Sequence, residues 1–420
     1  MTSSRALTVL IFSLLLTTLW SPSSIDGSVN VMDYLRYAVF GTLSLLILAV
    51  AYVHSRRNAT RLLLPSGPAL IALFILYCIA SVFWSEGSTS SIIKAVLLAL
   101  ALVTGLAAAA SKTNGELIRL VVASCAVVLV VGFAVSLLIP AIGIETGWQL
   151  EGKWRGISGQ KNEFGALAAI ALVGTYVLLR GPDPAHPQRR VLLRVLGLGF
   201  FTVCLLLSGS RGGQLIALVG FAAVMFTRLS RNLQNVTLFG AAVVALPFVA
   251  FAAMTFTAED THLSFAGLSF DTSNRTEIWA YGLENLRGRE LFGVGLASFW
   301  TPDRVEVFKA NHGWVLDNFH NGYMTVLIEE GLLGLSLFLL GMIMSFSMLR
   351  RMTADANKYA VFSFAYLNMV MVHNLVENTL GRSTNFMFIC FLFVLFSGFR
   401  GSFSAVLSRD ARRTSQIKTV

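Results

Sequence analysis

Long apolar stretches alternate with short polar connections from one end of the chain to the other. Each stretch has about 20 residues, the length at which an α-helix crosses the hydrocarbon core of a bilayer. The pattern predicts twelve transmembrane helices, at about residues 6–21, 34–53, 66–84, 90–110, 117–140, 163–180, 191–207, 211–228, 236–257, 320–349, 359–377 and 383–400. We therefore expect an all-α integral membrane protein, with residues 1–420 forming a single polytopic membrane domain.

Composition strengthens this prediction. Hydrophobic residues make up 55% of the chain and charged residues only 13%, whereas a soluble domain carries about 25% charged residues. The composition therefore excludes a water-soluble enzyme. The four cysteines, Cys78, Cys125, Cys204 and Cys390, fall inside predicted spans and far apart, so we expect small core residues rather than disulfides or metal ligands. Residues 6–21 precede a poor cleavage site and are predicted to be a signal-anchor helix.

The net charge of +10 raises the question of nucleic-acid binding, but the positions of the charges argue against it. Most of the 32 lysines and arginines lie in short connections on one side of the predicted spans. This is the bias that the positive-inside rule describes, and it predicts that both termini are cytoplasmic. The expected partner of this surface is the lipid bilayer, and no nucleic acid is expected.

Two connections on the opposite side of the membrane are long. Residues 141–162 form a basic loop with two tryptophans. Residues 258–319 form the only large segment outside the predicted spans, and a loop of this length in a compact protein is usually functional. Within it, Asn274 and Glu277 have capping-box spacing before an apolar stripe. The stripe predicts a short amphipathic helix at the membrane surface.

Four features on this side place a basic or titratable side chain where a helix begins. They are Lys161, Arg211 after a Ser-Gly-Ser sequence, Arg275, and His320. Helix N-termini present free N–H groups and a partial positive charge, which suits phosphate oxygens. Arginine adds a planar fork that binds phosphate through two hydrogen bonds. The pattern predicts a diphosphate site, with His320 kept neutral by the helix-end field as a general base.

Each of these residues also has a simpler interpretation. Arg211 alone fits a snorkelling interfacial arginine, and Arg275 fits one end of a surface ion pair. His320 fits an interfacial histidine bonded to a neighbouring carbonyl group, and Lys161 fits a solvated loop lysine. The repetition of one pattern at four helix starts favours the functional interpretation.

Other polar residues of the sequence carry weaker signals. Glutamates within a span are costly in lipid and should face the bundle interior. Glu377, near the outer end of its span, joins the active cavity or makes a helix–helix hydrogen bond. Gly293-Val294-Gly295 is interpreted as a turn. The sequence contains no Asp-x-Asp pair and no ligand cluster at metal-binding spacing, so no metal and no other cofactor is expected.

The order of the motifs is familiar. The chain resembles the superfamily of bacterial O-antigen ligases and O-antigen (exopolysaccharide) polymerases, most strongly over about residues 150–350. The matching positions are Trp84-Ser85, Arg155-Gly156, Lys161-Asn162, Leu207–Gly212, Asn274-Arg275, Leu291–Trp300, His320–Tyr323 and Glu330-Gly331.

The resemblance implies a GT-C-like helical fold and a metal-independent, inverting glycosyltransferase. Its donor would be a glycan linked to undecaprenyl diphosphate at the periplasmic face of the bacterial inner membrane. Its acceptor would be a sugar hydroxyl. Arg211 and Arg275 would bind the diphosphate and His320 would activate the acceptor. The remaining matched positions would bind the diphosphate or the glycan: Arg155, Lys161, Asn162, Asn321 and Glu330.

Two acceptors and one other class of protein remain open at this stage. The Lys161-Asn162 pair and the Gly-Val-Gly segment resemble the polymerising branch, whereas Arg211 resembles the ligases. We give polymerisation a slight preference over ligation to lipid A core. Twelve spans also suit a transporter or flippase, but such proteins keep polar sites near the bilayer midplane and show related halves. Here the polar residues gather at one face, so the enzyme is favoured.

Overall fold

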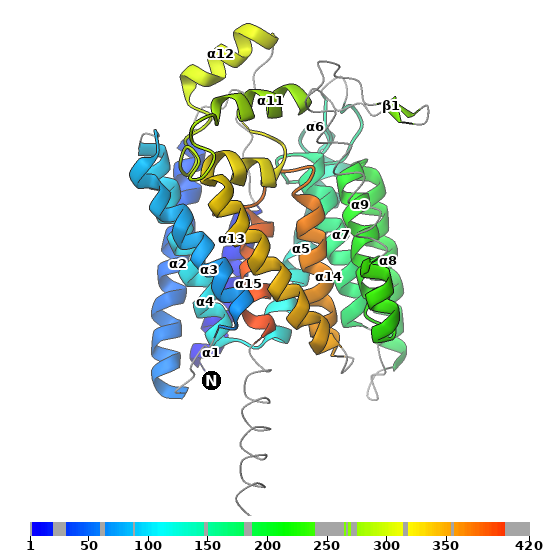
Figure 1. Ribbon diagram of the computed structural model, residues 1–420. Coiled ribbons are helices and arrows are strands. Elements are labelled where there is room, and N and C mark those ends of the chain that lie inside the picture. Colours follow the sequence, from blue (N-terminus) through cyan, green and yellow to red (C-terminus); the bar gives the residue numbers. More distant parts are fainter. Residues whose placement is uncertain are drawn as a thin grey trace, which may run out of the picture.

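The computed structural model is a helical bundle with smaller helices at one end (Figure 1). It describes residues 2–19, 31–58, 64–86, 89–146, 150–179, 187–239, 264–265, 268–269, 275–313, 318–353 and 357–399. The bundle contains α1 (Thr2–Thr18), α2 (Val31–Asn58), α3 (Ser66–Ala80), η1 (Ser81–Trp84), α4 (Thr89–Ser111), α5 (Asn114–Leu138), α7 (Lys161–Leu178), α8 (Pro187–Ser208), α9 (Arg211–Phe226), α13 (Gly322–Met352), α14 (Lys358–His373) and α15 (Phe386–Gly398). The all-α prediction is confirmed.

The smaller elements belong to the connections. They are α6 (Pro140–Gly143), a hairpin of β1 (Ser264–Phe265) and β2 (Leu268–Ser269), α11 (Arg275–Asn285) and α12 (Pro302–His312). Figure 1 shows α11 and α12 above the bundle, at the end opposite to the start of α1. The helices α7, α9 and α13 all begin at this upper end, where α11 crosses the bundle.

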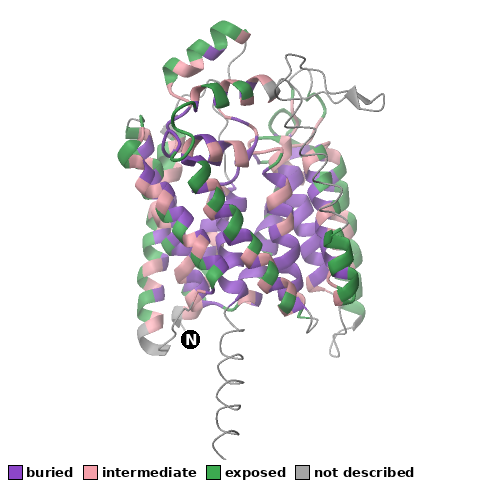
Figure 2. Ribbon diagram, in the orientation of Figure 1, coloured by how far each residue is buried: buried purple, intermediate pink, exposed green. Residues whose placement is uncertain are grey.

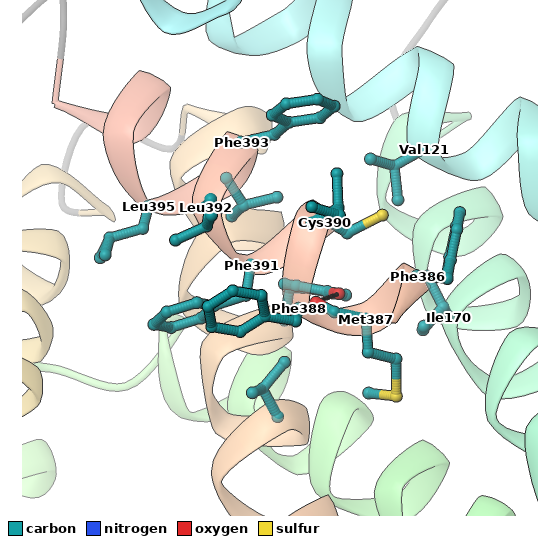
Figure 3. Close-up of a cluster of buried hydrophobic side chains, with 14 of the residues drawn as sticks. Val121, Ile170, Phe386, Met387, Phe388, Cys390, Phe391, Leu392, Phe393 and Leu395 are labelled. Carbon is teal, nitrogen blue, oxygen red and sulfur yellow. Dashed lines mark hydrogen bonds between the residues drawn. The ribbon is translucent and has the colours of Figure 1, made fainter. Parts of the chain in front are cut away.

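The core lies along α15, the most apolar helix of the bundle. Every residue of α15 is buried, and a helix that is hydrophobic on all sides belongs in an interior. Figure 3 shows its phenylalanines and Cys390 packed among side chains that include Val121 of α5 and Ile170 of α7. All four cysteines are buried and unbridged, which confirms their predicted place in the core.

The outer helices present apolar side chains to the surroundings. On α8, Val191, Leu196 and Leu206 are each more than half exposed. In Figure 2, purple buried residues concentrate inside the bundle and green exposed residues lie on its outside. Exposed leucine and valine along a helix of this length suit a lipid environment. The apolar exterior therefore supports a multi-pass membrane protein.

Length and hydropathy alone identify fewer spans than the twelve that the sequence pattern predicts. Within the described residues, six helices are long and apolar enough to cross a membrane: α2, α3 with η1, α4, α5, α8 and α13. Three shorter apolar helices cover Ser4–Thr18, Arg211–Phe226 and Phe386–Gly398. Most of the ninth predicted span, residues 236–257, lies outside the described residues. Twelve spans therefore remain a prediction.

Helix α13 is broken one third of the way along, at Gly331. Its φ of 67° and ψ of −172° are not helical. The segment 290–295 fills the break: Val294 N–H donates to Ile328 O (3.0 Å) and Leu332 N–H donates to Glu290 O (2.8 Å). In an unbroken helix Leu332 would donate to Ile328. Two further bonds join Gly295 N–H to Glu329 O (2.8 Å) and Leu333 N–H to Leu291 O (3.1 Å). The inserted backbone thus satisfies groups that the break leaves unpaired, as a low-dielectric site requires.

The glycines of Gly293-Val294-Gly295 and Gly331 allow the inserted backbone to approach α13 closely. A Cβ on Gly293 would lie 2.3 Å from Glu329 O, and one on Gly331 would lie 2.4 Å from Leu291 O. Gly293 also has φ of 72°, which side chains disfavour. The close approach of two backbones, rather than a simple turn, therefore accounts for these glycines.

The apolar stripe of helix α11 packs on protein. Ile278 and Leu286 are buried in a small second core with Phe299, Phe308 and Phe319. Trp279 Nε1 donates to Phe319 O (2.9 Å) and thereby ties α11 to the segment before α13. Asn274, the predicted cap of this helix, lies outside the described residues. The small core fixes α11 over the upper end of the bundle.

Candidate functional site

Three helices begin with a basic residue that lines one cavity. Lys161 is the first residue of α7, Arg211 of α9 and Arg275 of α11. The cavity has a volume of about 440 Å³, and these three residues line it together with Lys153 and Glu377. Two arginines that are 64 positions apart in sequence thus converge, as a single diphosphate ligand would require.

The start of α9 is built from its Ser-Gly-Ser sequence. Ser210 is the N-cap and its Oγ accepts from Gly213 N–H (3.0 Å). Gly209 has φ of 55° and its carbonyl accepts from Lys161 Nζ (3.4 Å). A Cβ on Gly209 would lie 2.5 Å from Lys153 Cδ. The bare glycine therefore lets Lys153 approach the backbone beside Arg211.

A chain of hydrogen bonds connects the start of α9 to Glu377. Ser210 Oγ donates to Asn162 Oδ1 (3.2 Å), and Asn162 Nδ2 donates to Glu377 Oε1 (2.8 Å). The other carboxylate oxygen, Glu377 Oε2, lies 3.9 Å from His320 Nδ1. This chain of hydrogen bonds joins residues from α9, α7 and the connection after α14 to the histidine before α13. Each polar group in it restrains the next.

His320 itself lies in an unusual backbone conformation. Its φ of 46° is in the left-handed region, which costs a non-glycine residue of order 1–3 kcal/mol. Its N–H donates to Asn318 Oδ1 (2.9 Å), and the next residue, Asn321, caps α13 by accepting from Tyr323 and Met324 N–H. The imidazole is 36% exposed and thus open to a ligand on one side.

The connection that carries Glu377 is held against the start of α13. Gly322 N–H donates to Asn374 O (2.8 Å) and to Glu377 O (3.1 Å). A Cβ on Gly322 would lie 2.2 Å from Asn374 Oδ1, and this same oxygen accepts from Thr379 N (3.0 Å). The glycine after Asn321 is therefore what allows Glu377 to come close to His320.

The electrostatics of the cavity are positive. Partial burial lowers the pKa of Lys161, and the nearby charge of Lys153 lowers it further. Arg211 acts in the same direction, whereas Glu145 and Glu377 oppose it. Like charges held this close to each other favour an anion between them. The cavity is thus suited to a ligand with at least one phosphate group.

A family comparison covers the segment that supplies much of this cavity. Residues 196–339 match the O-antigen ligase family. No curated protein sequence matches the chain. The match confirms the resemblance seen in the motifs and indicates a membrane glycosyltransferase of the O-antigen ligase and polymerase type. The segment that matches the O-antigen ligases contains Arg211, Arg275 and His320, whereas Lys161, Asn162 and the connection after α14 lie outside it.

Three predicted binding residues lie away from the cavity. Arg155 is paired with Glu145 (3.6 Å) and donates through Nε to Ile142 O (2.9 Å), so it braces the basic loop. Asn321 is 8% exposed and uses its side-chain oxygen as the helix cap. Glu330 is buried beside the break in α13, where its Oε1 accepts from Ser81 Oγ (3.3 Å). The structure gives all three a contact within the protein.

The sequence does not by itself assign two residues of the cavity lining, Lys153 and Glu377. Lys153 lies in the basic loop with Arg155 and Lys161, and spacing alone does not say which of the three faces the ligand. Glu377 stands at the end of an apolar span, which left a helix–helix hydrogen bond as the expected role. Its acidic side chain next to His373 and Asn374 was the available signal. The fold decides which of these side chains face the cavity.

The motifs singled out in the sequence thus divide into two groups. Those around Lys161, Arg211 and Arg275 line the cavity, and His320, which is not part of the lining, adjoins it through Glu377. Those around Trp84, Gly293 and Gly331 form a junction, in which Trp84 Nε1 donates to Phe292 O (3.3 Å). The junction anchors the segment between α11 and α13 to the bundle and so holds α11 in place above it.

Proposed function

We propose that this protein transfers a glycan from undecaprenyl diphosphate to a sugar hydroxyl at the periplasmic face of the bacterial inner membrane. The observation that carries the proposal is the convergence of Lys161, Arg211 and Arg275 on one cavity beside His320. A polyprenyl diphosphate has two adjacent phosphates, and three cations at three helix starts match them in charge and in hydrogen-bond donors.

In this reaction the acceptor oxygen forms a bond with C1 of the donor sugar. The bond between C1 and the phosphate oxygen breaks, and its electron pair leaves with the lipid diphosphate. Arg211, Arg275 and Lys161 stabilise the charge that develops on the leaving group. These side chains supply the positive charge for which other glycosyltransferases use a divalent cation, so the proposed transfer is metal-independent. Attack from the face opposite to the diphosphate inverts C1.

His320 takes the proton of the acceptor hydroxyl in this proposal. Proton transfer to a placed side chain contributes about 10²–10⁴-fold to such reactions. Glu377, within 3.9 Å of Nδ1, orients the ring and stabilises the imidazolium that forms. Glu377 is thus a positioning residue, and Asn162 holds it through the hydrogen bond to Oε1.

The proposal has two forms, polymerisation and ligation, which differ only in the acceptor. We keep a slight preference for polymerisation, in which the acceptor is the growing polysaccharide, because of the Lys161-Asn162 and Gly-Val-Gly motifs. Ligation to lipid A core is supported by the family that matches residues 196–339. Both forms share the donor, the cavity and the base.

The test is the surface glycan profile of a deletion strain that carries wild-type or variant protein. Single short repeats on lipid A core in the deletion would identify the polymerase, and long chains that accumulate on the lipid carrier would identify the ligase. A normal profile in the deletion would contradict both forms. The profile is read from a gel of extracted surface glycans together with mass spectrometry of the lipid carrier.

Variants of His320, the proposed base, and of Glu377 test the mechanism in the same strain. His320→Ala should abolish rescue, since it removes the proton acceptor. Glu377→Gln keeps an oxygen for Asn162 but loses the charge near His320, so we expect transfer to slow about 10- to 100-fold. Donor binding should not weaken, because the substitution removes a negative charge from the lining of the cavity. Glu284→Gln, on the exposed face of α11, is the matched control. Full rescue by His320→Ala would remove the base from the mechanism.

A further inference from the structure

At the end of the bundle opposite to the cavity, two arginines share one acceptor atom. Arg231 Nη1 donates to Gln234 Oε1 (3.0 Å), and Arg350 Nε donates to the same oxygen (2.9 Å). Arg231 belongs to a helix at residues 231–239. Arg350 lies in the last turn of α13, at the lower end of the bundle in Figure 1. Two separate helices thus hold two guanidinium groups around one neutral oxygen.

The amide of Gln234 is fixed by the end of α9 and the turn that follows it. Its side chain is 2% exposed, and its Nε2 donates to Phe226 O (3.2 Å) and to Leu229 O (3.1 Å). Because these two bonds use both amide hydrogens, the amide oxygen is the group that faces the arginines. A buried side chain therefore brings the two guanidinium groups together, rather than a flexible contact at the surface.

The positive charge of this arginine pair is not neutralised by an ion pair. Two further donors also meet neutral oxygens: Arg231 Nη2 donates to Arg351 O (3.2 Å), and Arg350 Nη2 donates to Asn235 Oδ1. Among the described residues, no carboxylate forms an ion pair with either arginine. The C-terminal end of α13 supplies only about half a negative charge. Two cations held this close repel each other unless an anion joins them.

Both guanidinium groups keep hydrogen-bond donors for such an anion. Each guanidinium has five N–H groups, and the four bonds described above use only some of them. Arginine binds phosphate through two parallel N–H groups of its planar fork. The arginine pair is therefore suited to a phosphate group.

Apolar side chains lie on the same helix faces as the two arginines. Ile343 precedes Arg350 on α13 by about two turns and is 65% exposed. Leu238 follows Arg231 by about two turns and is 48% exposed. Residues two turns apart lie on one face of a helix. A ligand that matches this surface has an anionic head for the arginines and apolar chains for the neighbouring faces.

We propose that Arg231 and Arg350 bind the phosphate of an anionic phospholipid in the leaflet at this end of the protein. Basic sites between membrane helices are suited to such headgroups. The acyl chains lie along the faces that carry Ile343 and Leu238. The bound phosphate offsets the repulsion between the arginines and so holds helix 231–239 against α13. The site is separate from the cavity and does not depend on the proposed function.

The test is the thermal midpoint of the purified full-length protein in detergent, titrated with phosphatidylglycerol or with phosphatidylcholine. Both lipids carry one phosphate, but the choline group of the second neutralises it. Phosphatidylglycerol should raise the midpoint by several degrees, because a ligand of the folded state stabilises it. Phosphatidylcholine should have little effect. Equal shifts with the two lipids overturn the inference, and so does an equal rise with inorganic phosphate, which lacks acyl chains.

Arginine variants locate the effect at this site. In the variant with both Arg231→Gln and Arg350→Gln, the phosphatidylglycerol concentration that gives half of the shift should rise about 30-fold. Arg350→Gln alone keeps the bond between Arg231 and Gln234 and should raise it about 5-fold. This milder variant gives the same test if the double variant does not fold. Arg189→Gln, exposed in the first turn of α8, is the control and should keep the wild-type value.

A variant of the cavity separates this site from the proposed diphosphate site. Arg211→Ala should keep the full response to phosphatidylglycerol, since Arg211 lies at the opposite end of the bundle. If Arg211→Ala removes the response and the double variant keeps it, the lipid phosphate occupies the cavity and the inference fails. The same result would leave the proposed function standing, because it would show that the cavity binds a phosphate.

Discussion

The basic residues of the cavity act through position as much as through charge. Lys161, Arg211 and Arg275 are each the first residue of a helix, where free N–H groups and the helix dipole add to the field of the side chain. Such a concentration of positive charge is unfavourable while no anion is bound. The pKa of Lys161 is lowered first by partial burial and then by the charge of Lys153, so this repulsion accounts for the second part of the shift.

The pKa of Lys161 predicts how donor affinity depends on pH. The amine is charged below its pKa, and it loses the charge as the pH rises through that value. Because the pKa lies below the ordinary 10.5, donor affinity should begin to fall at a lower pH than for an unperturbed lysine. The glycosyl diphosphate is a diester and does not titrate in this range, so calorimetry between pH 7 and 10 checks the prediction.

The matched variant for this test is Lys161→Arg. Arginine keeps its charge throughout this pH range, so the fall in affinity should move to higher pH. Lys309→Arg, on the outer helix α12 and remote from the cavity lining, should leave the wild-type curve in place. An identical curve for wild type and Lys161→Arg would mean that Lys161 does not contact the phosphates.

At the scale of elements, the positions of the cavity residues depend on where helices begin and where α13 is broken. The break in α13 exposes backbone groups, and segment 290–295 pairs with four of them, Ile328 O, Glu329 O, Leu332 N–H and Leu333 N–H. The same segment continues to Phe299 and Trp300, which pack on Tyr281 of α11. The junction therefore transmits the position of α13, a helix of the bundle, to α11, whose first residue lines the cavity.

A pair of glycine variants tests this role of the junction. Gly293 and Gly288 both have positive φ, but a Cβ on Gly293 meets Glu329 O at 2.3 Å while one on Gly288 meets nothing within 4 Å. Gly288→Ala should cost only the backbone strain, about 1–2 kcal/mol. Gly293→Ala must also separate the segment from α13, so its thermal midpoint in detergent should fall several degrees further. Equal midpoints would show that the close approach does not contribute to stability.

At the scale of the whole molecule, the candidate site residues all lie at one end of the bundle. The starts of α7, α9 and α13 and the helices α11 and α12 share this end (Figure 1). The opposite end holds basic residues such as Arg350 and Arg351 in the last turn of α13. If the positive-inside rule orients the protein, the cavity faces the periplasm.

Labelling of introduced cysteines tests this orientation. The four native cysteines are buried, so the wild type should react little with a membrane-impermeant maleimide. In spheroplasts, Glu306→Cys on the exposed side of α12 should label, and Arg351→Cys at the other end should label only after lysis. The reverse pattern would place the cavity on the cytoplasmic side and contradict the proposed donor site.

Much of the architecture follows from local sequence. An apolar run of about 20 residues has only the helix available to it in lipid, because every backbone group must be satisfied within the segment. The helices at 66–84, 90–110 and 320–349 were therefore predictable to within a few residues. The choice of Arg211, Arg275 and His320 as candidates also needed only their places at helix starts and the resemblance to O-antigen ligases.

Other features depend on contacts between distant segments, which no local pattern encodes. The break in α13 exists because residues 290–295 arrive to pair with it, and Gly331 by itself predicts only a flexible point. Glu377 faces His320 because Gly322 lets the connection after α14 pack on the start of α13. Arg155 and Lys153 are both cations, and only the path of the basic loop turns Lys153 toward the cavity and Arg155 toward Glu145. The sequence by itself determined the helices and the chemical character of the site, because these depend on hydropathy and side-chain type. The tertiary structure alone decided which side chains meet, because that depends on close packing between segments far apart in the chain.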